Sequence, residues 1–161
     1  MADLIIREIK STEFYLLEDF LYESIFQRDG NELLPRSVIE QPELKVYIDD
    51  FGKLDDHCLV AECDGKIVGA VWTRILCGEI KGYGYIDSKT PEFAISVRKE
   101  YRHKGIGTAL MKAQLKLLRR KGYKRASLSV QKDNYAVKLY KAVGFEVVDE
   151  HGEELLMVCE L

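Results

Sequence analysis

Arg102-His103-Lys104-Gly105-Ile106-Gly107 stands between an apolar, β-branched run at 93–97 and a segment at 108–118 whose apolar residues fall at helical spacing. We therefore expect a strand that turns directly into a helix. The first backbone N–H groups of a helix have no partner within it and lie at the positive end of its dipole. Gly105 and Gly107 let this backbone approach a ligand where a Cβ would collide. The stretch predicts a binding site for a phosphate or pyrophosphate.

Two common nucleotide motifs do not fit this turn. A P-loop would end in Gly-Lys followed by Ser or Thr, and no such ending is present. A dinucleotide-binding turn would require glycine where Leu110 stands. A nucleoside triphosphate or a dinucleotide is therefore disfavoured as the ligand.

Length and composition predict one globular domain over residues 1–161, with 47% hydrophobic and 32% charged residues. The net charge of −3 provides no basic field for nucleic acid. No apolar run approaches the ~20 residues that a membrane helix needs, and the start has no basic region followed by a long apolar stretch. We expect a cytoplasmic protein that binds neither nucleic acid nor membrane.

The cysteines and two of the histidines are expected to be structural. None of the cysteines has the Cys-x-x-Cys spacing of a metal or redox pair, and each lies in an apolar run, which predicts buried free thiols. His57 and His151 stand beside turns without companion ligands, so we expect them at the surface and expect no metal site. The four cysteines are Cys58, Cys63, Cys77 and Cys159.

The remaining sequence alternates strands and helices. Asp64-Gly65 between two apolar runs predicts a hairpin, and Gly122 and Gly144 are expected to end helices. A parallel crossover is expected at the anion site, after an antiparallel first half. Strands are expected at 4–9, 58–63, 66–72, 93–97, 125–130, 145–148 and 155–160. One helix is expected at 11–27, capped by Ser11 and ended by 29–31, and short helices are expected within 35–51, broken at Pro42. Further helices are expected after 107 and at 134–143, and a loop is expected at 78–91.

A second motif lies about 30 residues after the turn: Asn134-Tyr135-Ala136-Val137-Lys138-Leu139-Tyr140-Lys141-Ala142-Val143-Gly144-Phe145. Together the two stretches resemble the GNAT family of N-acetyltransferases, which carries Arg/Gln-x-x-Gly-x-Gly/Ala after its fourth strand and N-x-x-A-x-x-L-Y-x-x-x-G-F after its fifth. The resemblance implies an α/β fold with a mixed central sheet of about six to seven strands, splayed between strands 4 and 5 and flanked by about four helices.

The resemblance also implies acetyl-coenzyme A as co-substrate. The turn would hold its pyrophosphate, and the fourth strand would pair with its amide-bearing arm. Asn134 matches a position that typically hydrogen-bonds the cofactor, and it is also a candidate N-cap for the helix that follows. The expected cofactor-binding residues are Ile95, Ser96, Val97, Arg102, His103, Lys104, Gly105, Ile106, Gly107 and Asn134.

By the same resemblance Tyr140 protonates the departing thiolate, and a backbone N–H near Val97 polarises the thioester carbonyl. The candidate base is Glu92, although it stands one residue out of step with the expected position and would need a bulge to face the site. Ordered water, a carboxylate such as Asp87, or an acceptor that arrives as a neutral amine are alternatives.

The acceptor is a primary amine whose class remains open among aminoglycosides, polyamines, small amines and peptide N-termini. Segments 11–51 and 78–91 are expected to wall its pocket. A non-catalytic acyl-CoA-binding module of the same fold is the competing function, and a homodimer through the late strands follows the family's habit. Residues expected in the pocket are Trp72, Tyr83, Tyr85 and Asp87, with the pairs Asp49/Asp50 and Asp55/Asp56 favouring a cation.

Overall fold

Seven strands form one sheet in the computed structural model, which describes residues 3–27 and 33–161. Their order across the sheet is β1-β2-β3-β4-β5-β7-β6. The strands are β1 (Leu4–Glu8), β2 (His57–Cys63), β3 (Lys66–Arg74), β4 (Glu92–Val97), β5 (Arg125–Gln131), β6 (Glu146–His151) and β7 (Glu154–Glu160). The helices in the described residues are α1 (Leu17–Ser24), α2 (Pro42–Lys45), α3 (Ile106–Arg120) and α4 (Ala136–Ala142), with 3-10 segments at Ser11–Leu16, Arg36–Glu40 and Lys99–Tyr101.

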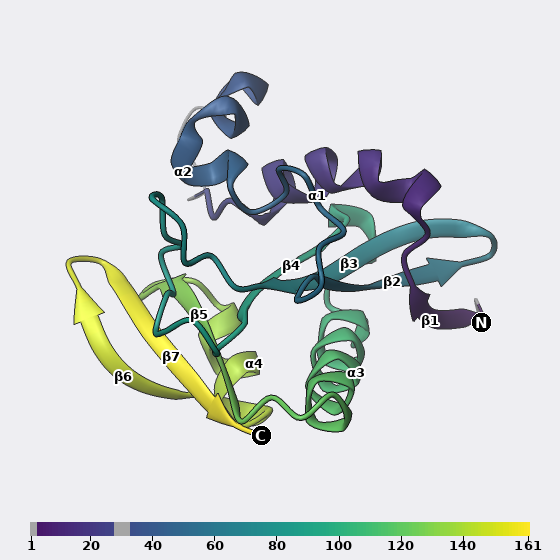
Figure 1. Ribbon diagram of the computed structural model, residues 1–161. Helices are drawn as coiled ribbons and strands as arrows, with labels where there is room; N and C mark the ends of the chain where they lie inside the picture. The colour runs from purple at the N-terminus through teal and green to yellow at the C-terminus, as the bar shows by residue number, and fades with distance from the viewer. Residues whose placement is uncertain (1–2, 28–32) are drawn as a thin grey trace.

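The sheet separates into two parts between β4 and β5. These strands are parallel and share one paired position, Glu92 with Ser127, whereas the other neighbouring strands are antiparallel over most of their length. In Figure 1 the group β5, β7 and β6 turns away from the group β1 to β4. The mixed, splayed sheet expected from the resemblance is therefore confirmed.

Helices cover both faces of the first group of strands. Figure 1 shows α1 on one side of β2, β3 and β4 and α3 on the other. Alternate residues of a strand point to opposite faces. Accordingly Val60 and Trp72 pack in the cluster under α1, while Leu59 and Val71 pack in the cluster under α3.

The hairpin and the short helices follow their local signals. Asp64 and Gly65 both have positive φ, 50° and 79°, the geometry that a two-residue turn between twisted strands requires. Pro42 is the first residue of α2, and the extended residue Gln41 separates it from the 3-10 segment Arg36–Glu40, so the break expected there is confirmed. Gly122 and Gly144, with φ of 90° and 115°, follow α3 and α4.

One expected helix differs in the structure. The segment that begins at Ser11 is a 3-10 helix as far as Leu16, and Lys10, not Ser11, is its N-cap. The reason is Glu13, whose carboxylate accepts two hydrogen bonds from Arg7 of β1 (2.9 and 2.8 Å) and one from the Lys10 N–H. These bonds fix the first turn against the strand. The expected end of this helix at 29–31 falls outside the described residues.

The cysteine expectation is wrong at one position. Cys58, Cys63 and Cys159 are buried free thiols, but Cys77 is exposed. Cys77 comes after β3, which ends at Arg74, so the chain has already left the sheet at this position. For this reason the thiol is exposed although its neighbours in the sequence are apolar. In the described parts of the chain, no helix combines the length and apolar character needed to cross a membrane.

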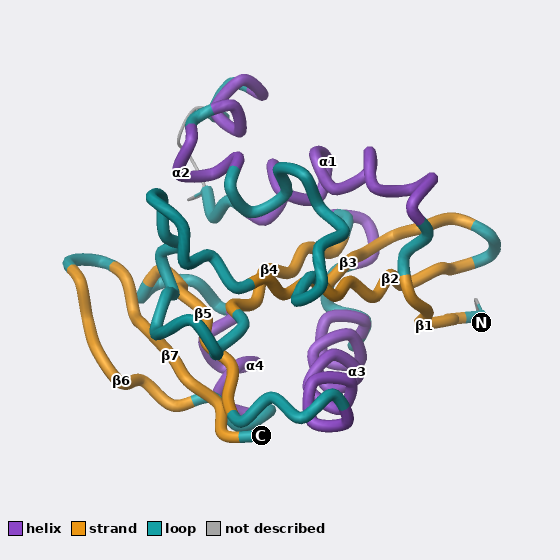
Figure 2. Tube along the Cα trace, viewed as in Figure 1, coloured by secondary structure: helices purple, strands orange, loops and turns teal. Residues whose placement is uncertain are grey.

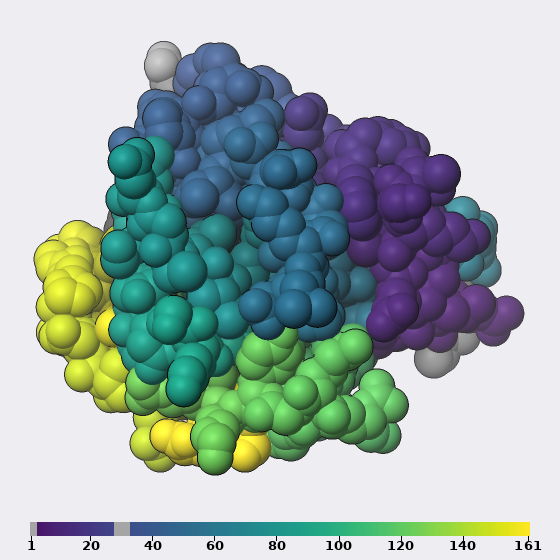
Figure 3. Space-filling view, viewed as in Figure 1, coloured from purple at the N-terminus to yellow at the C-terminus, as the bar shows by residue number. Residues whose placement is uncertain are grey.

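The connection between β3 and β4 is a long loop that packs between distant parts of the chain (Figure 2). In Figure 3 this teal segment lies against the yellow β6–β7 hairpin on one side and the blue segment around α2 on the other. Ser127 Oγ donates to Gly84 O at 2.6 Å, and the Tyr83 N–H donates to the Tyr47 hydroxyl at 2.8 Å. The loop thereby brings α2 and β5 to the start of β4.

Candidate functional site

The turn between β4 and α3 has the geometry of an anion site. Gly105 is the N-cap of α3 with φ of 85°, and His103 also has a positive φ, 63°. Ala109 donates to Gly105 O at 3.1 Å, whereas the helix amides that precede it have no such partner in the described residues. Arg102 is folded back, its Nε donating to Val97 O at 2.8 Å. The turn therefore presents free amides at the positive end of a fifteen-residue helix.

A cleft of about 570 Å³ opens beside this turn. Its walls come from the end of α1, the second half of β4, the turn and the start of α4. Of the ten expected cofactor-binding residues, eight line it: Ile95, Ser96, Val97, Arg102, His103, Gly105, Gly107 and Asn134. Lys104 and Ile106 do not, since the Lys104 ammonium lies over the Tyr101 ring (5.5 Å) and Ile106 is buried in the core.

The cleft suits an arm that carries amide groups. After Glu92 the backbone of β4 is paired with β3 alone among the described strands, so its other edge is available to a ligand. Ser96 Oγ is buried and has no hydrogen-bond partner in the described residues, and Ser96 lines the cleft. A buried polar atom without a partner is uncommon in proteins. These observations fit the coenzyme A arm that the resemblance implies.

A second, smaller cavity of about 210 Å³ meets the cleft. Tyr140, Asn134 and Ile95 line both spaces. Tyr140 is 9% exposed, and burial raises the pKa of its phenol, which keeps it protonated. Asn134 Oδ1 accepts the Ala136 N–H at 2.9 Å, at the first residue of α4, but the N-cap of this helix is Tyr135, so the N-cap prediction for Asn134 is wrong by one position.

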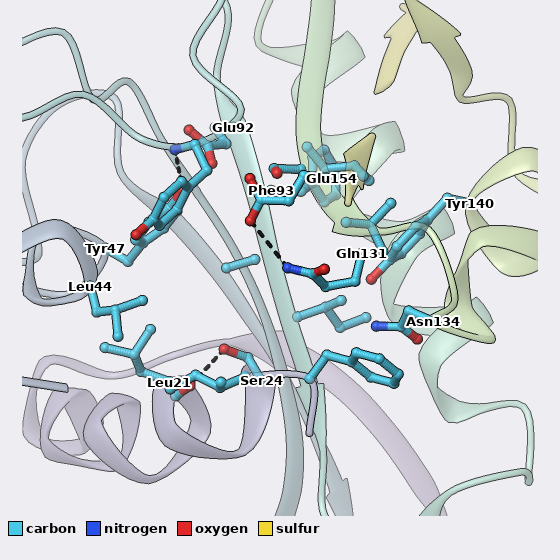
Figure 4. A pocket seen from close by; sticks show the side chains of 18 residues that line it. Leu21, Ser24, Leu44, Tyr47, Glu92, Phe93, Gln131, Asn134, Tyr140 and Glu154 are labelled. Carbon is cyan, nitrogen blue, oxygen red and sulfur yellow. Dashed lines mark hydrogen bonds between the residues drawn. The ribbon is translucent and has the colours of Figure 1, made fainter. Parts of the chain in front are cut away.

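Glu92 lines the smaller cavity and is 4% exposed. Its Oε2 accepts hydrogen bonds from the Tyr47 hydroxyl and from the Gly84 N–H (2.9 Å), while Oε1 has no partner in the described residues. Burial raises the pKa of Glu92 to about 7, against the lowering effect of the two hydrogen bonds. Figure 4 shows Tyr47 and Glu92 on one side of the cavity and Tyr140 and Asn134 on the other.

Glu92 reaches this cavity without a bulge in its pairing with β3, so the bulge expected from the sequence is wrong. The β3–β4 pairing runs in continuous register from Gly69–Val97 to Arg74–Glu92. The side chain of Glu92 thus shares the sheet face of Ala94, which packs in the cluster under α1. Tyr47 and the loop at 82–84 lie on that face and enclose the carboxylate.

The loop fits closely around this carboxylate because two of its residues are glycine. A Cβ on Gly82 would lie 2.0 Å from Glu92 Oε1. A Cβ on Gly84 would lie 2.9 Å from the backbone carbon of Leu128 and 3.0 Å from the Ser129 nitrogen. The absence of side chains at these two positions lets the loop close over Glu92.

Several residues expected around the acceptor lie elsewhere. Trp72 is 1% exposed and donates from Nε1 to Tyr47 O (3.0 Å), so it belongs to the core. Asp56 is buried against Arg74 (3.0 Å), and Asp55 accepts the Tyr123 hydroxyl (2.5 Å), so this pair is satisfied within the protein. The sequence pattern could not reveal these partners, because they are distant along the chain.

Of the residues in the 78–91 loop that were expected to line the acceptor pocket, only some do so. Tyr83 lines the smaller cavity as expected, but Tyr85 and Asp87 do not. Asp87 pairs with Arg125 at 2.7 Å, and that hydrogen bond, with those of Lys89 and Thr90, lowers the pKa of its carboxyl to about 2. A carboxyl with so low a pKa is a weak proton acceptor at neutral pH, which argues against the Asp87 alternative.

Neither of the two turn histidines lies in the site. His151 is exposed beside Asp149 (3.4 Å) as expected. His57 is half-buried, not fully at the surface, because its ring contacts Tyr123 with Nε2 3.2 Å from the hydroxyl. Within residues 3–27 and 33–161, no three His, Cys, Asp or Glu side chains gather as a metal site would require.

Three polar residues that line the smaller cavity were not predicted from the sequence: Tyr47, Gln131 and Glu154. Tyr47 lies just after α2, in the segment expected to wall the acceptor pocket, but no local pattern separated it from its neighbours. Gln131 and Glu154 face each other across the β5–β7 pair. Only the fold brings them opposite Glu92.

Comparison with known proteins places this geometry in a family. Residues 17–145 match the model of the acetyltransferase (GNAT) family. An N-alpha-acetyltransferase of Sulfurisphaera tokodaii is 32% identical over 106 residues, 63% of this chain and 64% of that one, so the match spans less than two thirds of the relative. An N-alpha-acetyltransferase of Saccharolobus solfataricus is 29% identical over 81% of this chain and 82% of its own. The fold is similar to that of a PaiA N-acetyltransferase from Thermoplasma acidophilum in complex with coenzyme A (TM-score 0.71, 22% identity, 99% of both chains).

Proposed function

The chain belongs to the GNAT family of acetyltransferases, and on that premise we propose that it transfers an acetyl group from acetyl-coenzyme A to a primary amine. The observation that carries this proposal is the meeting of two cavities at Tyr140. One is the cleft beside the anion turn, and the other contains Glu92, a buried carboxyl whose pKa is about 7. The arrangement supports a donor on one side of Tyr140 and an acceptor on the other.

The cleft residues bind and orient the donor. Amides of the turn at 102–107 receive the pyrophosphate, and the free edge of β4 at 95–97 pairs with the arm. A backbone N–H near Val97 is the proposed donor to the carbonyl oxygen, where negative charge develops during attack. When bound, acetyl-coenzyme A supplies an activated acyl group on sulfur. This chain supplies the groups that move protons.

Glu92 and Tyr140 take opposite parts in that proton movement. The amine attacks as the neutral base, forming a C–N bond as the C–S bond breaks. Glu92, with a pKa near neutrality, accepts a proton from the nitrogen directly or through water. Tyr140 donates its phenolic proton to the departing sulfur. Both groups return to their starting states by exchange with solvent, so the products are the amide and the free thiol of coenzyme A.

A module that binds acyl-CoA without turnover is the alternative function. The buried phenol at the junction of the two cavities favours the enzyme, because a sensor has no need of a proton donor beside the thioester. The presence of a separate cavity with its own carboxyl favours it as well.

A melting experiment followed by an acceptor panel tests the proposal. Acetyl-coenzyme A should raise the melting temperature, as any ligand of the native state does, and free adenine should raise it far less. Coenzyme A release is then measured with small amines, polyamines, aminoglycosides and peptides. The absence of a shift at millimolar acetyl-coenzyme A would overturn the cofactor assignment. A shift without turnover on any amine would favour the binding module.

A further inference from the structure

The acceptor cavity, defined as the 210 Å³ space lined by Glu92, holds a second carboxylate that the proposed chemistry does not use. Glu154, the first residue of β7, lines this cavity. Its Oε1 accepts a hydrogen bond from Gln131 Nε2 at 3.3 Å, drawn as a dashed line in Figure 4. Among the described residues no Lys, Arg or His side chain is paired with it. Within residues 3–27 and 33–161, the negative charge of Glu154 therefore has no cationic partner.

The wall of the acceptor cavity is mostly apolar, and its two carboxyl groups have no basic residue beside them in the described lining. Of the described residues that line it, Glu92 and Glu154 are acids and none is Lys, Arg or His. The Tyr83 phenol at the rim has a raised pKa, caused first by burial and then by the charges of Glu154 and Glu43. The cavity thus has a negative field that would repel an anionic acceptor and attract a cationic one.

Glu92 provides the independent sign that a ligand enters here. Its carboxyl is almost fully buried, yet Oε1 has no hydrogen-bond partner in the described residues. Buried oxygens of this kind are normally satisfied, so Oε1 is open to a donor that the described residues do not supply, either an ordered water or a bound molecule. The reacting nitrogen of the acceptor is such a donor. The reacting nitrogen would supply the missing hydrogen-bond donor to Glu92 Oε1, but it leaves the Glu154 carboxylate without a positively charged partner.

We propose that the acceptor carries a second ammonium group besides the amine that is acetylated, as in a short aliphatic diamine or polyamine, and that Glu154 binds this second charge. The inference rests on the proposed function and names the substrate class of the same site. In Figure 4 Glu154 lies between Glu92 and Tyr140, so both nitrogens face carboxylates of one small space. Its volume of about 210 Å³ is below the ~300 Å³ at which pockets for larger ligands begin, and suits a slender chain.

Matched amines test the charge requirement on the unmodified enzyme. 1,4-Diaminobutane and butylamine have the same carbon chain and differ in the second nitrogen. The ratio kcat/KM should be about tenfold or more higher for the diamine, because only the diamine places a charge at Glu154. A dipeptide with a free N-terminus and neutral side chains is the third substrate. Equal rates for diamine and butylamine, or a preference for the dipeptide, would overturn the diamine proposal.

Variants test the assignment to Glu154. Glu154→Gln keeps the shape and the Gln131 contact but removes the charge, and it should raise KM for the diamine about tenfold while leaving KM for butylamine and kcat for both little changed. Glu153→Gln is the matched control, since Glu153 is the exposed neighbour and lines neither cavity. The melting shift with acetyl-coenzyme A shows that each variant is folded. An equal effect of Glu154→Gln on both amines, or no effect on either, would contradict the proposal.

The two proposals fail in different ways. If no amine, butylamine included, releases coenzyme A, the proposed function itself is wrong and the acceptor proposal falls with it. If butylamine reacts as well as the diamine, the acetyltransferase function stands and only the role of Glu154 is overturned.

Discussion

The Tyr47 hydroxyl donates a hydrogen bond to Glu92 Oε2, which joins the segment after α2 to the first residue of β4. The same hydroxyl accepts the Tyr83 N–H at 2.8 Å, and the Gly84 N–H donates to the same carboxylate oxygen at 2.9 Å. One phenol therefore links three parts of the chain around the proposed base. This makes Tyr47 a positioning residue for Glu92.

Tyr47→Phe should shift the pH dependence of activity. The hydrogen bond from Tyr47 stabilises the charged carboxylate and lowers the pKa of Glu92, so its loss raises that pKa above about 7. Because a base acts when deprotonated, the rising limb of kcat/KM against pH should move to higher pH. The pH profile at saturating acetyl-coenzyme A measures this.

The control for this shift is Tyr15→Phe, which makes the same chemical change at an exposed position. Its profile should coincide with that of the wild type. A Tyr47→Phe profile that also coincides would mean that Glu92 is not the group that titrates in the rate.

Glu92 should also make stability depend on pH. Its pKa is about 7 in the folded protein and 4.5 in a model peptide, so the folded state favours the protonated form. This contribution is fully present below pH 4.5 and is lost as pH rises to about 7. The shift corresponds to about 3 kcal/mol in the free energy of unfolding.

Denaturation of wild type and Glu92→Gln between pH 4.5 and 8 measures this effect. The wild type should lose stability relative to the variant as pH rises to 7, with no further change above it. Glu79→Gln, at an exposed loop position, should follow the wild type. A constant difference between wild type and Glu92→Gln across the range would contradict the raised pKa.

Gly82→Ala should reduce activity by displacing Glu92. The added Cβ would lie 2.0 Å from Glu92 Oε1 and 3.0 Å from Leu76 Cδ1, so the carboxylate has to move. We expect kcat to fall at least tenfold, within the range of removing a general base, with acetyl-coenzyme A binding retained. Gly78→Ala is the control in the same loop, because its Cβ would meet nothing within 4 Å. Equal kcat values for the two variants would show that the loop does not hold the base.

Local signals predicted the parts of the fold that local physics determines. Asp64-Gly65 specified its hairpin through positive φ, and Gly105 specified the turn before α3 in the same way. The 3-10 start of the first helical segment was not predictable, because it depends on Arg7 of β1 reaching Glu13.

The acceptor cavity was the least predictable part of the site. Glu92, Tyr47 and Glu154 come from three separate regions, and their approach depends on sheet order and on a glycine loop. Asp55 and Asp56 looked available in sequence because their partners, Tyr123 and Arg74, are far along the chain. Motif spacing predicted the residues of the proposed donor half of the site, whereas only packing brings together the residues of the proposed acceptor half.

The most direct measurement of the central claim is kcat of Tyr140→Phe with an amine that the wild type acetylates. The variant keeps the ring that packs against Phe145 (6.3 Å between centroids) and loses only the proton donor. We predict that kcat falls by about 100-fold or more, as for loss of a general acid, while the affinity for acetyl-coenzyme A is unchanged. A kcat within about twofold of the wild type would contradict the assignment of Tyr140 as the acid.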